Sequence, residues 1–139
     1  MLSPADMDRT MDEHFRFEAL DDIDGVVSTL TEDVEHDVVG FPGGPTHGRD
    51  GARKFYEATF PDLADGRVET VCRLYGENFL VDESLWSGRA PGTPFGVVGR
   101  DRPLAFRLLH IVEFAGDGRI SRENVWLDLA AIQQQLPAI

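Results

Sequence analysis

Hydrophobic residues recur at helical spacing in the first part of the chain. A helix is predicted to begin at Ser3-Pro4, where a capping hydroxyl precedes a proline at the first helical position. A second helix is expected after Asp21-Asp22, and a third is expected to begin at Asp50. The stripes expected to be buried are Met7, Met11 and Phe15 in the first helix, Ile23, Val26, Val27 and Leu30 in the second, and Ala52, Phe55, Tyr56 and Thr59 in the third. His14 borders the first stripe and is expected to be partly exposed.

Most of the remaining chain alternates between apolar and polar residues, which is the period of a half-buried strand. The alternating segments are residues 33–39, 67–75, 79–87, 104–114 and 119–128. Helices followed by consecutive strands predict one α+β domain over residues 1–139, with a curved antiparallel sheet packed on the N-terminal helices. The segment 88–96 is rich in proline and glycine and is a candidate lid or dimer-contact loop.

The last two strands form a predicted hairpin around Gly116-Asp117-Gly118, a turn signal with glycine available for a left-handed position. Centring the pairing on this turn places His110 opposite Asn124, with Trp126 and Asp128 on the same face. This face would combine apolar residues with a few convergent polar groups, as small-molecule pockets do. A slip of one residue would move the polar set to the other face of the sheet.

Three further polar residues are candidates for the same pocket. His36 alternates with Val34 and Val38, so it points inward by pattern, although most such histidines are hydrogen-bonded core groups. Glu83 shares a face with Phe79, Val81 and Leu85 and would be an acid on an apolar face. The third candidate is Tyr56, which would direct its hydroxyl into the cavity or serve as an ordinary core aromatic.

Composition narrows the classes of function. The chain has 13 Lys and Arg against 25 Asp and Glu, a formal net charge of −12, which argues against nucleic acid or an anionic membrane as partner. No apolar run is long enough to span a bilayer, and the single cysteine, Cys72, excludes an internal disulfide, so a cytoplasmic protein is expected. The four histidines are too scattered to predict a metal site, and no phosphate-binding loop or serine elbow is present, so no cofactor is expected.

Several segments together resemble the SnoaL-like polyketide (ester) cyclase family of the nuclear-transport-factor-two-like superfamily. The segments that carry the resemblance are 35–37 with 47–48, 83–88, 92–96, 106–110, 116–120, 122–128 and 135–136. The resemblance implies a cone-shaped α+β fold in which a strongly curved sheet encloses a deep pocket. It also implies a dimer formed through the outer sheet face, and ring closure by intramolecular aldol chemistry without a cofactor. By motif position, Asp128 and His110 are the residues that would carry this chemistry, with the aspartate as acid/base.

The expected function is therefore cofactor-free acid/base chemistry on a carbonyl compound, of the cyclase (aldol) or isomerase type, with a small apolar or polyketide-like ligand. The alternative is a non-catalytic ligand-binding or dimerisation module with the same pocket, because one fold serves many functions. Asp128 is either an acid/base group with a pKa raised by desolvation or merely the cap of a terminal helix. In the superfamily, epoxide hydrolases place an arginine between two acids, whereas Arg107 is expected on the face opposite His110.

A homodimer is expected for a physical reason as well. Leu109 and Ile111, together with Val125 and Leu127, are apolar residues on the face that this register turns away from the pocket. An antiparallel sheet with two apolar faces needs cover for the second one.

Overall fold

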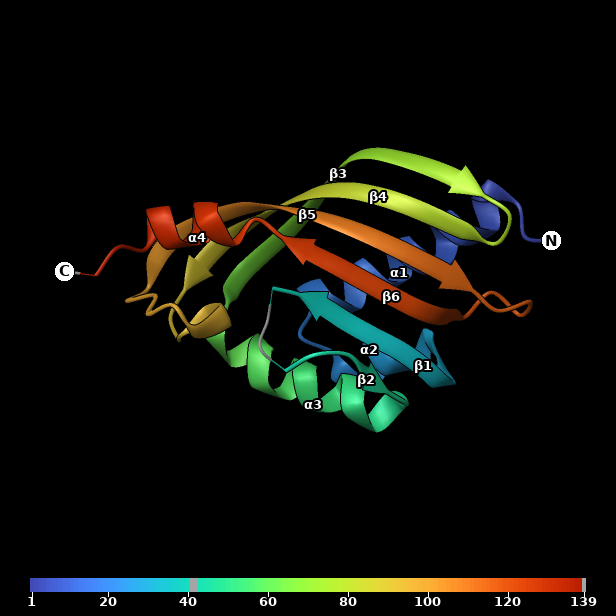
Figure 1. The fold of residues 1–139 in the computed structure, drawn as a ribbon, viewed down its shortest axis with the longest axis horizontal. Helices are drawn as coiled ribbons and strands as arrows, with labels where there is room; N and C mark the ends of the chain where they lie inside the picture. The colour runs from blue at the N-terminus through green and yellow to red at the C-terminus, as the bar shows by residue number, and fades with distance from the viewer. Residues whose placement is uncertain (41–42, 139) are drawn as a thin grey trace.

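The computed structural model describes residues 1–40 and 43–138, and this part of the chain folds into one six-stranded sheet with helices on its inner face (Figure 1). The sheet order is β2-β1-β6-β5-β4-β3. The helices are α1 (Pro4–Ala19), α2 (Ile23–Ser28), α3 (Arg49–Thr59) and α4 (Leu129–Gln135), with short 3-10 turns η1 (Phe60–Asp62) and η2 (Pro94–Gly96). The strands are β1 (Leu30–Val39), β2 (Thr46–His47), β3 (Ala64–Gly76), β4 (Phe79–Ala90), β5 (Arg102–Phe114) and β6 (Ile120–Leu127).

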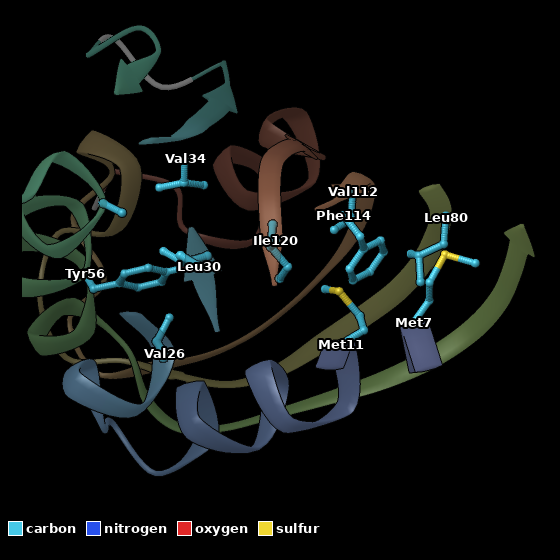
Figure 2. Packing of buried hydrophobic residues seen from close by; sticks show 11 residues of the cluster. Met7, Met11, Val26, Leu30, Val34, Tyr56, Leu80, Val112, Phe114 and Ile120 are labelled. Atoms are coloured by element: carbon cyan, nitrogen blue, oxygen red, sulfur yellow. The ribbon is translucent and has the colours of Figure 1, made fainter. Parts of the chain in front are cut away.

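The predicted α+β class and the curved sheet are confirmed. In Figure 2 the long strands curve around helix α1, which lies in their concavity. The strand pairs are antiparallel except for β1 with β6, which are parallel. No short turn connects these two strands, since most of the chain lies between them, so no hairpin forces the antiparallel direction.

Helix α1 begins as its sequence predicts, but His14 takes the place of Phe15 among its buried residues. Ser3 Oγ accepts a hydrogen bond from Asp6 N at 3.1 Å, and Ser3 N donates to Asp6 Oδ2 at 3.0 Å, which completes a capping box. The buried residues of the helix are Met7, Met11 and His14. His14 is 0% exposed, so the expectation of a partly exposed histidine was wrong.

Two apolar clusters hold the helices to the sheet. The first, shown in Figure 2, packs α1, α2 and α3 against the strands through Met7, Met11, Val26, Leu30, Val34, Ala52, Tyr56, Leu80, Val112, Phe114 and Ile120. The second packs α4 and the far ends of the strands through Val38, Trp86, Ala90, Leu104, Phe106, Leu108, Val125, Ile132 and Leu136. The sheet therefore has one face buried by helices, while several apolar side chains of the other face remain exposed.

The hairpin of β5 and β6 has the predicted turn but not the predicted register. Gly118 has φ +91°, the left-handed conformation that the turn requires, and Phe114 pairs with Ile120 as expected. The register then shifts, because Ser121 is an extra residue on β6. Beyond this β-bulge, His110 pairs with Val125. A bulge reverses which side chains face inward along the rest of the strand, and no simple alternation predicts it.

The bulge corrects the placement of Asn124, Trp126 and Asp128, because none of them lies on the inner face with His110. Trp126 is 38% exposed on the outer face, and Asn124 is buried there with its Nδ2 3.5 Å from Asp37 Oδ2. Asp128 caps helix α4, where its carboxylate accepts a hydrogen bond from Ala131 N at 3.1 Å. The inner positions of β6 are instead taken by Glu123, Val125 and Leu127.

Candidate active site

A cavity of about 140 Å³ lies between the inner face of the sheet and helices α1 and α3. Its wall is mostly apolar and rich in aromatic rings, namely Phe15, Phe55, Tyr56, Phe60, Trp86, Phe95 and Phe106. Trp86 and Phe106 stack with ring centroids 5.2 Å apart, and Phe95 meets Phe106 edge to face at 6.0 Å. The polar groups that line the cavity include Glu18, His36, His110 and Glu123. A largely apolar cavity with a few polar groups is the usual constitution of a small-molecule site.

The first polar group at the cavity is a set that we call the carboxylate–histidine cluster: His14, Glu18, His36, Tyr56 and Glu123. All of these except His14 line the cavity, and all except Glu18 are buried. Its centre is the Glu123 carboxylate. Oε2 lies 3.1 Å from His14 Nε2, and Oε1 lies 3.3 Å from His36 Nε2. The Tyr56 hydroxyl donates to Glu123 Oε1 at 3.4 Å. Glu18 Oε2 lies 3.6 Å from the same His14 nitrogen. Helices α1 and α3 and strands β1 and β6 each contribute to this cluster.

Hydrogen bonds define the charge of His14. The Thr29 hydroxyl donates its one proton to Val26 O at 2.6 Å, so it must accept from His14 Nδ1 at 2.8 Å. With Nδ1 protonated, Nε2 faces the Glu123 carboxylate and is stabilised there as a second N–H. Burial alone would lower the pKa of His14, but the charges of Glu123 and Glu18 outweigh burial and raise it to about 9. His14 is therefore a buried cation at neutral pH.

The surroundings shift the pKa values of the two carboxyl groups of the cluster in opposite directions. Burial would raise the pKa of Glu123, yet the charge of His14 and the hydrogen bonds from His14 and His36 hold it well below its ordinary value. For Glu18, burial is the largest influence and raises the pKa, although His14 partly opposes it. Glu123 is thus a fixed anion, while Glu18 retains its proton to a higher pH than an ordinary glutamate.

His110, which lines the cavity, forms an aspartate–histidine dyad with Asp82, which is not among the lining residues. Asp82 is 0% exposed and accepts hydrogen bonds from Arg73 Nε at 2.7 Å, from Thr70 Oγ1 at 3.1 Å and from the Ser84 hydroxyl. His110 Nδ1 lies 3.5 Å from Asp82 Oδ1 and has no hydrogen-bond partner among the described residues. Although burial would raise the pKa of Asp82, its interactions with His110, Arg73 and Ser84 lower it to about 2. An ionised Asp82 favours a proton on the facing His110 nitrogen.

Arg73 connects this dyad to helix α1. Its Nη1 lies 2.9 Å from Asp8 Oδ1 and its Nη2 lies 2.8 Å from Asp12 Oδ1, while its Nε donates a hydrogen bond to Asp82. The Arg73 side chain is only 9% exposed, and its carboxylate partners raise its pKa above an already high ordinary value. A planar guanidinium with several carboxylate partners is a rigid clamp, so the Asp82 side chain is held in one orientation.

The structure brings together three of the residues predicted for the pocket. His36, Tyr56 and His110 all line the cavity and are nearly fully buried. Asn124, Trp126, Asp128 and Glu83 do not line it. Trp126, Asp128 and Glu83 instead border an open hollow on the outer face of the sheet. The bulge at Ser121 moved the first three of these four away, as described above.

Glu83 was placed on the wrong face for a different reason. Both faces of β4 carry apolar residues, and the outer ones, Phe79 and Leu85, remain 40% and 37% exposed. The apolar neighbours of Glu83 therefore do not mark the inner face. Its carboxylate lies 3.7 Å from Arg107 Nη2 on the outer face. The acidic residue on the inner face of this strand is Asp82.

Four functional candidates were missed in the sequence, namely His14, Glu18, Asp82 and Glu123. Asp82 shares its parity on β4 with Leu80 and Trp86, but the opposite face of this strand is also apolar, so alternation alone does not select Asp82. Glu123 carried no such signal, because only the bulge at Ser121 turns it inward. Helical spacing does place His14 and Glu18 one turn apart, but it does not show which carboxylate they meet.

Two kinds of feature are absent from the described residues. Within residues 1–40 and 43–138, no group of three or more His, Cys, Asp or Glu side chains is arranged to hold a metal ion. No helix in the same part of the chain is long and apolar enough to cross a membrane.

A family model shows what kind of protein this is. The model of the SnoaL-like polyketide cyclases matches residues 5–136. The chain belongs to this family. The resemblance seen in the sequence is therefore confirmed, and the cavity and its two polar groups belong to a SnoaL-like protein. No curated protein is similar enough to the chain to count as a match.

Solved structures share the fold of this SnoaL-like chain at low sequence identity. A protein of Jannaschia sp. CCS1 described as a SnoaL-like polyketide cyclase has a TM-score of 0.85 and 17% identity, over 100% of this chain and 98% of its own. TsrD from Streptomyces laurentii has a TM-score of 0.85 and 19% identity, over 100% of both chains. An epoxide hydrolase of the LEH-like type from M. tuberculosis has a TM-score of 0.73 and 15% identity, over 95% of this chain and 90% of its own. Such identities establish the nuclear-transport-factor-two-like fold and not a shared reaction.

Proposed function

We propose that this protein is a cofactor-free small-molecule enzyme in which His110, oriented by Asp82, transfers a proton to or from a carbonyl compound. The observation that carries the proposal is the contact of 3.5 Å between His110 Nδ1 and Asp82 Oδ1 at the wall of an apolar cavity. A carboxylate behind an imidazole fixes its tautomer and orientation, which is how many enzymes prepare a histidine as general base.

The chemical argument follows from the charge of Asp82. Its pKa, lowered to about 2, keeps it ionised at neutral pH. The proton on the facing nitrogen then stays at Nδ1, and Nε2 of His110 is left to exchange protons with a ligand. An apolar wall strengthens these interactions, because charges are poorly screened there.

The same first step serves both reactions expected from the sequence. Removal of a proton next to a carbonyl group gives an enolate, which either attacks a second carbonyl group in an aldol ring closure or is reprotonated elsewhere in an isomerisation. The aromatic wall formed by Trp86, Phe95 and Phe106 suits a planar, apolar or polyketide-like ligand. The epoxide-hydrolase reaction is less well supported, because Arg107 is on the outer face and no arginine is among the described residues that line the cavity.

The test is hydrogen exchange at carbon. β-Tetralone is a compact aromatic ketone whose acidic C–H bonds exchange with heavy water, and NMR follows the loss of their signals. We expect the wild-type protein to accelerate this exchange and His110→Gln to lose roughly 10² to 10⁴ of the acceleration. His47→Gln is the matched control, since His47 is an exposed histidine outside the cavity. Equal rates for wild type and His110→Gln would refute the proposal, and binding of β-tetralone without exchange would favour the non-catalytic binding module.

We also propose a homodimer formed through the outer face of the sheet. Exposed apolar side chains of this face include Val71 and Leu74, both 63% exposed, together with Phe79, Leu85, Leu109 and Trp126. Of the residues that suggested this interface in the sequence, Leu109 and Ile111 do lie on the outer face, whereas Val125 and Leu127 line the cavity. Sedimentation equilibrium should give twice the monomer mass, and Leu74→Glu should give the monomer. A monomeric wild type at micromolar concentration would contradict this proposal. The cytoplasmic location stays a prediction.

A further inference from the structure

Two carboxylates in the cavity compete for one nitrogen. His14 Nε2 lies 3.1 Å from Glu123 Oε2 and 3.6 Å from Glu18 Oε2. Only one N–H is available at Nε2, and a hydrogen bond weakens steeply as it lengthens or bends. Glu123 therefore holds the proton of His14, and Glu18 keeps only a longer electrostatic contact.

The two carboxylates also differ in their other partners and in their access to the cavity. Glu123 has His36 at 3.3 Å and Tyr56 at 3.4 Å, and its side chain is only 2% exposed. The Glu18 side chain is 25% exposed and lines the cavity. A ligand in the cavity would therefore meet Glu18 with free acceptor or donor capacity, whereas Glu123 is already satisfied.

We propose that Glu18 of helix α1 is a second proton-transfer group of this cavity, acting on the substrate oxygen while His110 acts on carbon. This inference rests on the proposed function, because it assigns the partner of His110 in the same reaction. Both residues line one cavity and come from different elements, α1 and β5, so a carbonyl compound between them would have one group on each side.

The proposed step transfers two protons. Nε2 of His110 takes a proton from the carbon next to the carbonyl group, and the electron pair of that C–H bond forms a carbon–carbon double bond. The carbonyl π pair moves to oxygen, which takes the proton of the Glu18 carboxyl group. The products are a neutral enol, a Glu18 carboxylate and a His110 imidazolium. In the reverse direction Glu18 recovers the proton from oxygen as His110 returns one to carbon. Solvent deuterium enters through the imidazolium.

The groups that face Glu18 are compatible with this role. His14 of its own helix and His110 of β5 favour its carboxylate form, whereas Glu123 of β6 opposes a second negative charge nearby. Tyr56 of α3 interacts with both carboxylates. Burial outweighs the histidines and raises the pKa of Glu18, so Glu18 keeps its proton to a higher pH than an ordinary glutamate. Pairs of acids whose pKa values are driven apart by their surroundings often divide the roles of fixed anion and proton donor.

The experiment compares Glu18→Gln with Glu13→Gln in the β-tetralone exchange assay. Glu13 is a half-exposed residue of the same helix whose one ion pair within the described residues is with Arg16 at 3.9 Å, so it controls for charge removal from α1. We expect Glu18→Gln to lower kcat by about 10²-fold with little change in KM, because glutamine keeps the shape but cannot release a proton. The wild-type rate should fall as pH rises through the pKa of Glu18, and this fall should be absent in Glu18→Gln.

The outcomes separate this inference from the proposed function. If His110→Gln is as active as wild type, the proposed function fails. If His110→Gln is inactive while Glu18→Gln keeps the wild-type kcat and pH profile, only the role of Glu18 is overturned. Glu18→Asp keeps an acid with a shorter reach, so it should retain the alkaline fall at a reduced rate. This variant provides the same test if Glu18→Gln does not fold.

A binding measurement tests Glu18 independently of turnover. The para-nitrophenolate ion resembles an enolate, since both carry negative charge on an oxygen attached to a planar carbon frame, and its absorbance separates bound phenolate from bound phenol. We expect wild type to bind it with an affinity that falls as Glu18 loses its proton, and Glu18→Gln to lack this dependence. The same pH dependence in both proteins would overturn the proposal.

Discussion

The two buried carboxylates of this protein, Asp82 and Glu123, are held ionised by different kinds of partner. Asp82 is held by Arg73, a cation at every relevant pH, as well as by two hydroxyl groups and by His110. In the described part of the chain the ion-pair partners of Glu123 are histidines, His14 and His36. Two carboxylates with similar burial can therefore serve different tasks. The Asp82 region keeps a permanent cation beside its carboxylate, whereas the Glu123 region ties folding to the charge of His14.

The largest expected effect is on stability, from removing the anion of the histidine-held region. Glu123→Gln should lower the free energy of unfolding by about 3 to 5 kcal/mol, because it leaves the buried His14 cation without its nearest partner. Urea unfolding followed by circular dichroism measures this. Glu113→Gln, on a half-exposed side chain of β5 that is paired with Arg122 at 3.0 Å, is the control and should change stability by less than about 1 kcal/mol. Equal effects of the two variants would remove the contrast between a buried ion pair and an exposed one.

A second effect is that the two regions should lose stability at opposite ends of the pH range. The pKa of His14 rises on folding from 6.5 to about 9, so its contribution to stability is complete below pH 6.5 and is lost as pH rises through 9, a loss of about 3 kcal/mol. The pKa of Asp82 falls on folding from 3.8 to about 2, so its contribution is complete above pH 3.8 and is lost toward pH 2, about 2 kcal/mol.

Unfolding measured across the pH range should therefore show a loss of stability on each side of neutrality. His14→Gln should remove the loss between pH 6.5 and 9 and keep the Asp82 part of the acid loss. The Glu123 part of the acid loss should shrink, because the charge of His14 is what chiefly lowers the pKa of Glu123. Asp82→Asn should weaken the acid loss and leave the alkaline one unchanged. If His14→Gln and wild type lose stability equally between pH 6.5 and 9, His14 is not the buried cation described above.

The smallest effect concerns the geometry of the Asp82 region. Arg73→Lys keeps the charge beside Asp82 but loses the planar fork that also reaches Asp8 at 2.9 Å and Asp12 at 2.8 Å. We expect a loss of about 1 to 2 kcal/mol in the free energy of unfolding, from the side-chain hydrogen bonds that lysine cannot replace. Arg16→Lys, at an exposed position of α1, is the control. An unchanged stability of Arg73→Lys would show that charge alone, and not the fork, holds Asp82.

Sequence patterns were sufficient for the fold and for three of the seven polar residues of the site. Helical and strand periods predicted the α+β class, and alternation along β1 correctly turned His36 inward between Val34 and Val38. These predictions succeeded because one face of each element is buried by a continuous apolar cluster.

The errors came from structural features that the hydrophobic periodicity of the sequence does not predict. One extra residue, Ser121, reversed the inner face of β6, so Glu123 replaced Asn124 and Asp128 became a helix cap. On β4 both faces are apolar, so alternation could not distinguish Asp82 from Glu83. His14 was taken for a surface residue, because nothing local indicates a buried carboxylate from a strand more than a hundred residues later.

The central claim is that Asp82 positions His110 for proton transfer, and Asp82→Asn tests it most directly. The measurement is the rate of β-tetralone deuterium exchange, with the affinity for β-tetralone determined in parallel to show that the cavity is intact. The claim predicts that Asp82→Asn still binds the ketone while its exchange rate falls by roughly 10²-fold or more, since an amide no longer fixes the imidazole tautomer. A folded Asp82→Asn protein that exchanges β-tetralone at the wild-type rate would contradict it.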